Sequence, residues 1–349
     1  MTANPVAESG PRRAATGTAP GTPRGWTPVQ YLALAGMALA AFELWSWARW
    51  LAGGPHQLTQ YRDPSDPSWY AARVYEVLML ICVLGIGTKV IRDCRRERRL
   101  TIDAMMVIGG ATTLFWDPMV NWLQPSFMYS SQWLNLNTWV GDVPGIPNPH
   151  GDQMPQPVFI MFIYPFGLVL FALGLNRLMG WLRGRWPRLS TFQLVGLTFL
   201  AALAICVALE APMFLLNLWG LPGAPSQFAL FGDTHRFAFA EYLTTTLVFG
   251  LLGVLRHFRD DRGHHLVERG LGHLSPRRRT VTSVFATIAY MNGALIALIL
   301  CQVPTGMHAA PYPNYPAHLV NGLCNAGPFS HTAYGPCPGS PGFRIPINQ

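Results

Sequence analysis

Residues 190–213 read STFQLVGLTFLAALAICVALEAPM, a run that stays apolar for long enough to cross a lipid bilayer. A membrane-spanning helix needs roughly 20 apolar residues to cover a hydrocarbon layer of about 30 Å. The alternating ten-residue segments of a transmembrane barrel are not seen. We therefore predict an all-α fold, a polytopic membrane helix bundle of about seven transmembrane helices. The predicted spans are 28–51, 71–92, 101–123, 157–178, 190–213, 236–257 and 281–303.

Composition and charge placement support this architecture. The chain has 349 residues, of which 50% are hydrophobic and 12% charged, whereas soluble proteins carry about 25% charged residues. A cytoplasmic N-terminus with seven spans puts 20 of the 25 Lys and Arg residues on the cytoplasmic side, as the positive-inside rule requires. We predict a multi-pass protein of the cell membrane with its C-terminus outside. The basic segments then face anionic lipid headgroups, and no nucleic-acid partner is expected.

Three regions follow from this topology. Residues 1–27 are expected to form a disordered tail without a signal peptide. Residues 28–303 form the membrane domain, with ordered outer loops at 124–156 and 214–235, and residues 304–349 form an extracytoplasmic tail rich in Pro, Gly and aromatic residues. Tryptophans near the outer interface either form an aromatic belt or line a pocket for a large apolar ligand. They are Trp45, Trp47, Trp50, Trp69, Trp116, Trp122 and Trp219.

Five carboxylates lie within the predicted spans. A charge in hydrocarbon is costly unless it is paired, protonated or hydrated. A helical rise of about 1.5 Å per residue places all five in the outer third of the bundle. Either they belong to an ion-pair lattice that ties helix ends together, or they form a polar chamber for acid chemistry. These candidate catalytic residues are Glu43, Glu76, Asp117, Glu210 and Glu241.

Two of the five suggest an acid and its partner. Asp117 follows two aromatic residues and has no basic neighbour in sequence, so desolvation would keep it protonated and make it the candidate general acid. Glu76 lies three residues after Arg73 on the same helical face and is the candidate ionised partner. Polar and aromatic side chains near the five carboxylates are the candidate substrate-binding residues. They are Arg73, Arg236, Trp116, Asn121, Trp122, Tyr129 and Trp139.

Metal and cofactor motifs are not recognisable in the chain. No cysteine pair has zinc-site spacing, and there is no P-loop, dinucleotide fingerprint, GxSxG or HExxH motif. His264, His265 and His273 share a loop that favours a solvated basic segment over a metal site. We predict no metal and no cofactor, and a disulfide between Cys324 and Cys337 on the oxidising outer side.

One block of sequence is more specific than the rest. It begins with FWDPMVNW at 115–122, continues through Pro125, Tyr129, Asn135, Trp139 and Pro144, and ends with MPQP at 154–157. This block resembles the AveC-type spirocyclase family, to which the chain is also similar in length and hydropathy. The resemblance carries over no catalytic residues, so the carboxylate assignments rest on the residues alone.

The resemblance implies a reaction and a substrate class. Family members from avermectin, milbemycin and meilingmycin pathways close a spiroketal on a polyketide macrolide. One hydroxyl of a dihydroxy-ketone forms a hemiketal, loss of water gives an oxocarbenium ion, and the second hydroxyl traps it. Removal of water from the new ring is an optional further step in the avermectin member. A lipophilic macrolide would reach the pocket from the bilayer, and two carboxyls would serve as acid and counter-anion, as in glycoside hydrolysis.

Two other functions are compatible with a seven-span protein. A transporter or efflux helper for a lipophilic polyketide also uses acids within the membrane, more typically near the midplane and in paired, broken helices. A structural membrane adaptor needs no carboxylates at one depth. The clustering of the acids toward one side favours the enzyme. The substrate's identity and the oligomeric state are left open by the sequence.

Overall fold

A computed structural model describes residues 25–58, 62–121, 127–145, 154–221, 229–230, 235–306 and 315–320, without the side chains of 239–241, 302–306 and 320. Several predictions fall outside this description. They concern Trp122, the side chain of Glu241, the Cys324–Cys337 disulfide, most of the N-terminal tail and most of the C-terminal tail.

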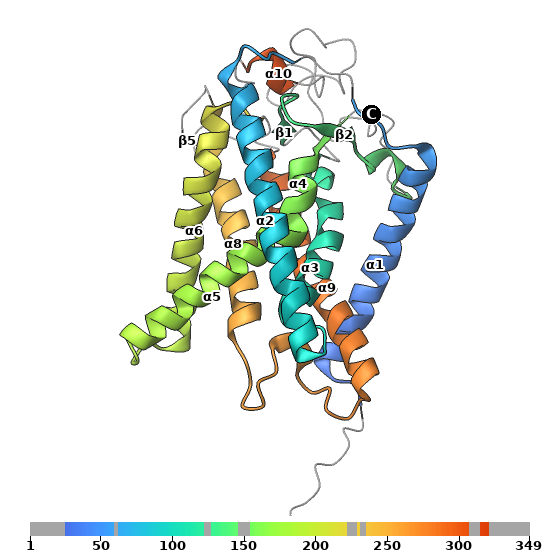
Figure 1. Ribbon diagram of the computed structural model, residues 1–349, viewed down its shortest axis with the longest axis vertical. Helices are drawn as coiled ribbons and strands as arrows, with labels where there is room; N and C mark the ends of the chain where they lie inside the picture. The colour runs from blue at the N-terminus through green and yellow to red at the C-terminus, as the bar shows by residue number, and fades with distance from the viewer. Residues whose placement is uncertain are drawn as a thin grey trace, which may run out of the picture.

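Each predicted span contains a helix, and the helices stand together as a bundle (Figure 1). Among the described residues, five stretches are long and apolar enough to cross a membrane: α1, α2, the α4–α5 stretch, α6 and α9. The total of seven spans and the orientation of the two ends stay predictions. The described helices are α1 (Pro28–Gly53), α2 (Pro67–Glu97), α3 (Ile102–Thr113), α4 (Val158–Phe162), α5 (Leu168–Arg185), α6 (Thr191–Leu215), α8 (Phe239–His257), α9 (Pro276–Gly306) and α10 (Ala317–Val320).

The third predicted span is not one continuous α-helix. Its helix α3 has 12 residues, and the chain then continues through two 3₁₀ turns, Leu114–Trp116 and Pro118–Asn121. Pro118 has no backbone N–H to donate, so it cannot extend the hydrogen-bond ladder of α3. Asp117 therefore lies between two tight turns instead of on a regular helix surface.

The fourth span is interrupted by a π-helical turn, Ile163–Gly167, between α4 and α5. Such turns are rare and occur often at functional sites. The turn contains Pro165, which lacks a backbone donor. It packs against α3 at Gly110, where any Cβ atom would collide with the carbonyl oxygen of Tyr164. Glycine thus allows direct backbone contact between α3 and the π turn.

Helix α9 lies between α1 and α3, and α8 packs against α5, α6 and α9. The α1–α9 contact is close because Gly36 has no side chain: a Cβ there would collide with the carbonyl oxygen of Phe285. In the first turn of α3, the carboxylate of Asp103 accepts hydrogen bonds from Lys89 Nζ at 2.6 Å and Arg256 Nε at 2.7 Å. This buried ion group joins α2, α3 and α8.

The described segments that connect the helices at one end of the bundle, together with α10, form a cap there (Figure 1). Ser131 holds α10 in this cap, because its backbone N–H and its hydroxyl both donate to the carbonyl oxygen of His318, at 2.7 and 3.0 Å. Trp133 stacks on Phe159 with 4.7 Å between ring centroids. Three antiparallel strand pairs contribute: β1 (Met128–Tyr129) with β4 (Trp219–Gly220), β2 (Asn135–Asn137) with β3 (Pro155–Pro157), and β5 (Ala229–Leu230) with β6 (Phe237–Ala238).

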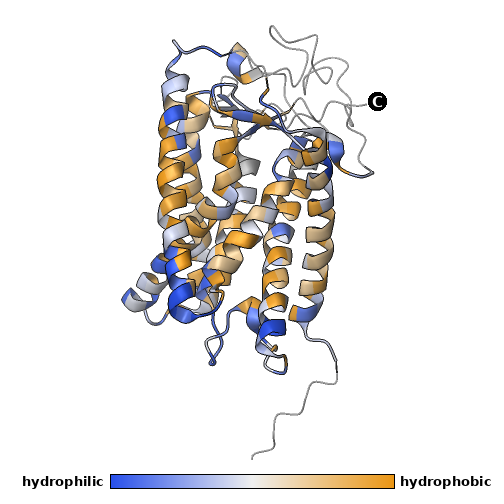
Figure 2. Cartoon of the chain, turned by 45° about the vertical axis from the view of Figure 1, so that its right-hand side comes forward, coloured by the Kyte–Doolittle hydropathy of each residue, from blue (hydrophilic) through white to orange (hydrophobic). Residues whose placement is uncertain are grey.

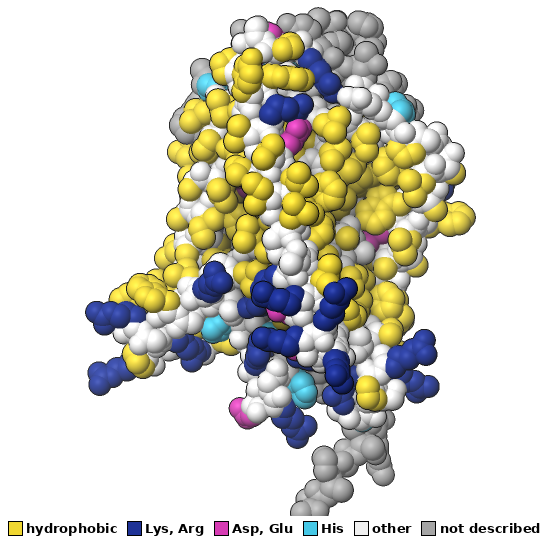
Figure 3. All heavy atoms as spheres, viewed as in Figure 1, with side chains coloured by type: hydrophobic (Ala, Val, Ile, Leu, Met, Phe, Trp, Pro, Cys, Tyr) yellow, Lys and Arg dark blue, Asp and Glu magenta, His cyan; other side chains and the backbone are white. Residues whose placement is uncertain are grey.

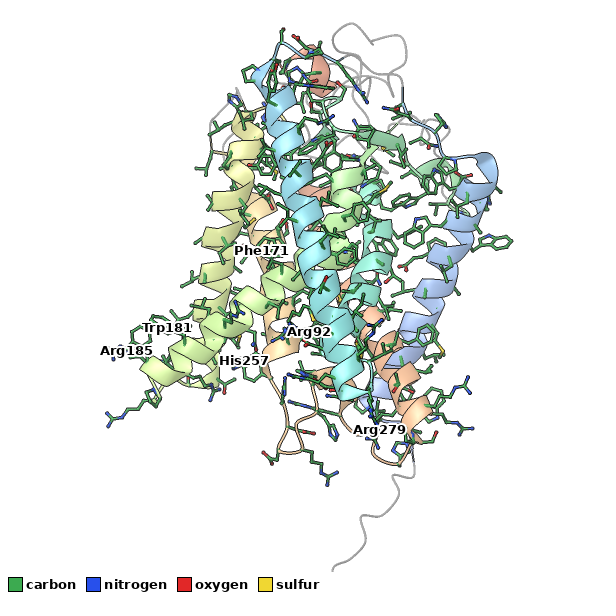
Figure 4. All side chains as sticks on the ribbon, in the orientation of Figure 1. Arg92, Phe171, Trp181, Arg185, His257 and Arg279 are labelled. Carbon is green, nitrogen blue, oxygen red and sulfur yellow. The ribbon has the colours of Figure 1, made fainter. Side chains whose placement is uncertain are left out.

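The surface agrees with a membrane environment. Hydrophobic residues follow the middle of the long helices in Figure 2, and yellow side chains cover the same band in Figure 3. Lys and Arg gather at the end of the bundle opposite the cap, where Arg92, Arg185 and Arg279 are labelled in Figure 4. This distribution fits the charge asymmetry seen in the sequence.

Candidate active site

A cavity of about 360 Å³ lies within the bundle beneath the cap. Its walls come from α2, α4, the π turn, α5, α6, α8 and α9, together with the segment that contains Trp116 and Asp117. Apolar and aromatic side chains make up most of the lining, including Phe171, which stacks on Phe249 with 4.2 Å between ring centroids. Among the lining residues of the described chain, only Asp117 and Glu210 are charged types. Within the described part of the chain, the cavity is thus an apolar chamber with two carboxyl groups.

Asp117 is held by donors from three different elements. The Tyr129 hydroxyl donates to both carboxylate oxygens, at 2.9 Å to Oδ1 and 3.0 Å to Oδ2. The Tyr164 hydroxyl donates to Oδ1 at 2.8 Å, and Gln156 Nε2 donates to Oδ2 at 2.9 Å. Because each oxygen has at least two donors, the orientation of the carboxyl group is fixed at the cavity wall.

Local structure explains how these donors converge. Tyr129 lies in β1, opposite Trp219 of β4, which also lines the cavity. Gln156 lies at the centre of β3, opposite Leu136. Tyr164 lies in the π turn, which packs directly against α3. Asp117 is therefore held by two residues of the cap, Tyr129 and Gln156, and by Tyr164 of the fourth predicted span.

Asn121 bonds to the backbone of Phe127 and is not among the residues that line the cavity. Its Nδ2 donates to the Phe127 carbonyl oxygen at 2.7 Å, and its Oδ1 accepts from the Phe127 N–H at 2.8 Å. These two bonds join the turn after Asp117 to the residues that lead into β1. A role of Asn121 in substrate binding stays a prediction.

Glu210 brings a second carboxyl group to the same cavity from α6. Its Oε1 accepts a hydrogen bond from Cys206 Sγ at 3.3 Å, one helical turn earlier, and both residues line the cavity. Of the five carboxylates predicted from the sequence, Asp117 and Glu210 are thus the two that the described structure brings into one chamber.

Glu76 and Arg73 form the ion pair that their spacing predicts, with 2.8 Å between Nη2 and Oε1. The pair serves the cap, because Arg73 also donates to the Gln132 carbonyl oxygen at 2.7 Å and Glu76 accepts from the Leu134 N–H at 3.0 Å. Neither residue is among those that line the cavity. Their geometry fits the ion-pair lattice better than a catalytic role.

Glu43 lies behind the cavity wall. It is fully buried in α1, and its Oε1 accepts a hydrogen bond from the Trp116 indole N–H at 2.9 Å. Its other oxygen, Oε2, has no hydrogen-bond partner among the described residues. Trp116 lines the cavity whereas Glu43 does not, so Glu43 reaches the site only through that indole.

The remaining candidates lie in the cap or outside the described side chains. Trp139 donates from its indole to the Phe115 carbonyl oxygen at 3.0 Å and packs edge-on against Trp47. Arg236 is buried in the cap with a positive φ of 40°, a backbone conformation that non-glycine residues seldom adopt. Neither lines the cavity in the described chain. The side chain of Glu241 and all of Trp122 lie outside the description.

Two of the donors to Asp117 were not among the predicted site residues. Gln156 belongs to the MPQP motif at 154–157, which marked the end of the specific block. Tyr164 precedes Pro165 in the middle of an apolar span. A polar residue next to a proline inside a span is a usable signal, since the proline frees backbone groups and distorts the helix there.

One comparison with known protein families gives a match. Residues 97–339 match the family model described as "Spirocyclase AveC-like". The chain belongs to the AveC-like spirocyclase family. No curated protein and no solved structure matches it.

The matched region of this AveC-like protein contains both cavity carboxyls and all three donors to Asp117. Glu43, Arg73 and Glu76 precede it. Family membership implies a cyclase enzyme and suggests a spiroketal cyclase role, and the apolar helices suggest that it is a membrane protein. Both carboxyl groups of the chamber thus fall within the matched region, whereas the part of the lining that α2 contributes precedes it.

The hydroxyl of Tyr164 gives a direct test of the site. We expect Tyr164→Phe to lower kcat/KM by about 10- to 150-fold, because it removes one donor from the carboxyl group at a cost of roughly 1.5–3 kcal/mol. Tyr75→Phe is the matched control, since Tyr75 lines the same cavity but does not bond to Asp117. Steady-state rates in lipid nanodiscs would measure both. Equal rates for the two variants would show that the Tyr164 hydroxyl does not support the site.

Proposed function

We propose that this protein is a spiroketal cyclase of the cell membrane that acts on a dihydroxy-ketone polyketide macrolide. The observation that carries the proposal is Asp117, a carboxyl group fixed by three donors on the wall of an apolar cavity. It lies inside the region that matches the spirocyclase family. An apolar chamber suits a lipophilic substrate, and a fixed carboxyl group suits proton transfer.

In the proposed reaction, the Asp117 carboxyl group gives one proton to the substrate and later takes one back. One substrate hydroxyl adds to the ketone carbon, a C–O bond forms, and the hydroxyl proton moves to the former carbonyl oxygen to give a hemiketal. The Asp117 carboxyl group protonates the hemiketal hydroxyl, which leaves as water, and an oxocarbenium ion forms. The second hydroxyl attacks the cation, and its proton returns to Asp117. One water molecule is released and no atom changes oxidation state overall, so the proposal includes no cofactor.

The other polar groups have supporting roles in this scheme. Tyr129, Tyr164 and Gln156 keep the carboxyl group oriented while its charge changes. Glu210 provides a second carboxyl group in the same chamber and acts as the counter-anion to the oxocarbenium ion. Aromatic walls hold the chain in one conformation, so that the second hydroxyl reaches one face of the cation.

Purified protein in lipid nanodiscs, incubated with a dihydroxy-ketone precursor and no energy source, tests the proposal. We expect release of one spiroketal epimer, identified by chiral chromatography, faster than in nanodiscs without protein. An epimer ratio equal to that of acid-catalysed closure, or no conversion above the protein-free rate, would contradict it. Uptake of unchanged precursor by proteoliposomes without conversion would favour a transporter instead.

A further inference from the structure

Three residues that line the cavity are also exposed, large apolar residues. They are Leu78 of α2, Leu170 of α5 and Leu209 of α6, with exposed fractions of 54%, 50% and 46%. A residue that is exposed at the protein surface and also lines a cavity lies at the point where the cavity opens. The cavity therefore has its mouth between α2, α5 and α6, the region where Figure 4 labels Phe171.

This mouth faces the hydrophobic band of the bundle. Leu80 of α2 and Leu200 of α6 lie on two of the three helices around the mouth and are exposed to 58% and 64%. Both helices are apolar enough to cross a membrane. Exposed leucines of this kind face lipid in a membrane-spanning helix. On the cap side the lining includes Tyr129 and Trp219, the paired residues of β1 and β4. Access from the bilayer is therefore open, whereas the cap covers the end of the cavity.

The size of the cavity limits what enters it. At about 360 Å³ it is near the lower end of the range of roughly 300–1,000 Å³ that is found for sites of drug-sized ligands. A macrolide contains a large lactone ring in addition to the segment that carries the ketone and the two hydroxyls. A cavity at this end of the range suits that segment alone better than that segment together with the whole lactone ring.

We propose that the substrate is held across this mouth, with its dihydroxy-ketone segment inside against Asp117 and its lactone ring outside in the lipid. The inference rests on the proposed function and adds which part of the substrate the protein recognises. Contacts inside the cavity reach only the segment that becomes the spiroketal. A short lipophilic dihydroxy-ketone without the lactone ring is therefore also a substrate. Larger side chains at the mouth lower the turnover of the macrolide more than that of the short compound.

Tryptophan substitutions at the mouth test this arrangement. Leu78→Trp and Leu209→Trp add bulk at the opening from two helices. Leu80→Trp and Leu200→Trp are their matched controls, because they lie on the same helices with similar exposure but do not line the cavity. Each protein is assayed in nanodiscs with a macrolide precursor and with a short dihydroxy-ketone that lacks the lactone ring.

We expect wild type to convert both compounds. The two mouth variants should lose about tenfold or more in kcat/KM for the macrolide, with a clearly smaller loss for the short compound, while the two controls behave as wild type. Turnover of the short compound also shows that each variant is folded. Rejection of the short compound by wild type, or mouth variants that match their controls on the macrolide, would overturn the inference. Failure of wild type to convert either compound would instead overturn the proposed function.

Discussion

Asp117→Asn is expected to slow spiroketal formation by about 10² to 10⁴-fold, the range that a positioned acid–base group contributes. The substitution keeps the size of the side chain but removes the proton that Asp117 supplies to the leaving hydroxyl. The two tyrosine hydroxyls and Gln156 still surround the new amide, and Gln156 can turn its Oε1 to accept from the amide N–H, so the fold should persist. Residual product should show the epimer ratio of uncatalysed closure. Rates and epimer ratios in nanodiscs, read by chiral chromatography, measure both effects.

Glu76→Gln is the matched carboxyl-to-amide control for this experiment. Glu76 pairs with Arg73 and accepts from the Leu134 N–H, and it does not line the cavity. We expect its product to keep the wild-type epimer ratio, with at most a small loss of thermal stability. If Asp117→Asn instead keeps the wild-type rate and epimer ratio, Asp117 has no part in the reaction.

The helices follow from the sequence because the length and hydropathy of a span are local properties. Each predicted span contains a helix, and the largest difference arises where Pro118 and Pro165 interrupt the regular hydrogen-bond pattern. Asp117 was recognisable for a similar reason, since a carboxyl group in an apolar segment with no cation nearby is conspicuous on sequence alone. Two of the hydrogen-bond partners of Asp117 were not recognisable, because Gln156 and Tyr164 are 39 and 47 residues further along the chain.

The sequence also did not predict which face of each helix meets the cavity. On α2, the residues that line the cavity are Tyr75, Leu78, Met79 and Cys82, which share one face at helical spacing. Glu76 is one residue away from this face and points to the cap instead. Depth in the membrane can be counted from the sequence. Rotation about the helix axis depends on which helices are neighbours, and nearly uniform hydrophobicity leaves it undetermined.

Gly110→Ala is expected to disrupt the site from outside the cavity. A Cβ at this position collides with the carbonyl oxygen of Tyr164 and lies 2.8 Å from its carbonyl carbon and 3.0 Å from Pro165 Cα. These are backbone atoms, so the π turn itself must move away from α3. We expect a loss of about 1–3 kcal/mol in stability, typical of overpacking, and a large fall in kcat. Thermal unfolding and steady-state rates in nanodiscs measure the two effects.

The activity loss should exceed what instability explains, because Tyr164 and Asp117 share a 2.8 Å hydrogen bond and belong to the two elements that are forced apart. Gly109→Ala is the graded control, since its Cβ lies closest to the flexible Met291 side chain, at 2.7 Å from Sδ, and next to Thr287 Cγ2 at 3.4 Å, which are side-chain atoms and not backbone. Gly174→Ala on α5 has open space and should leave both measurements unchanged. If Gly110→Ala and Gly109→Ala lose stability and activity to the same extent, backbone contact between α3 and the π turn is not what positions Tyr164.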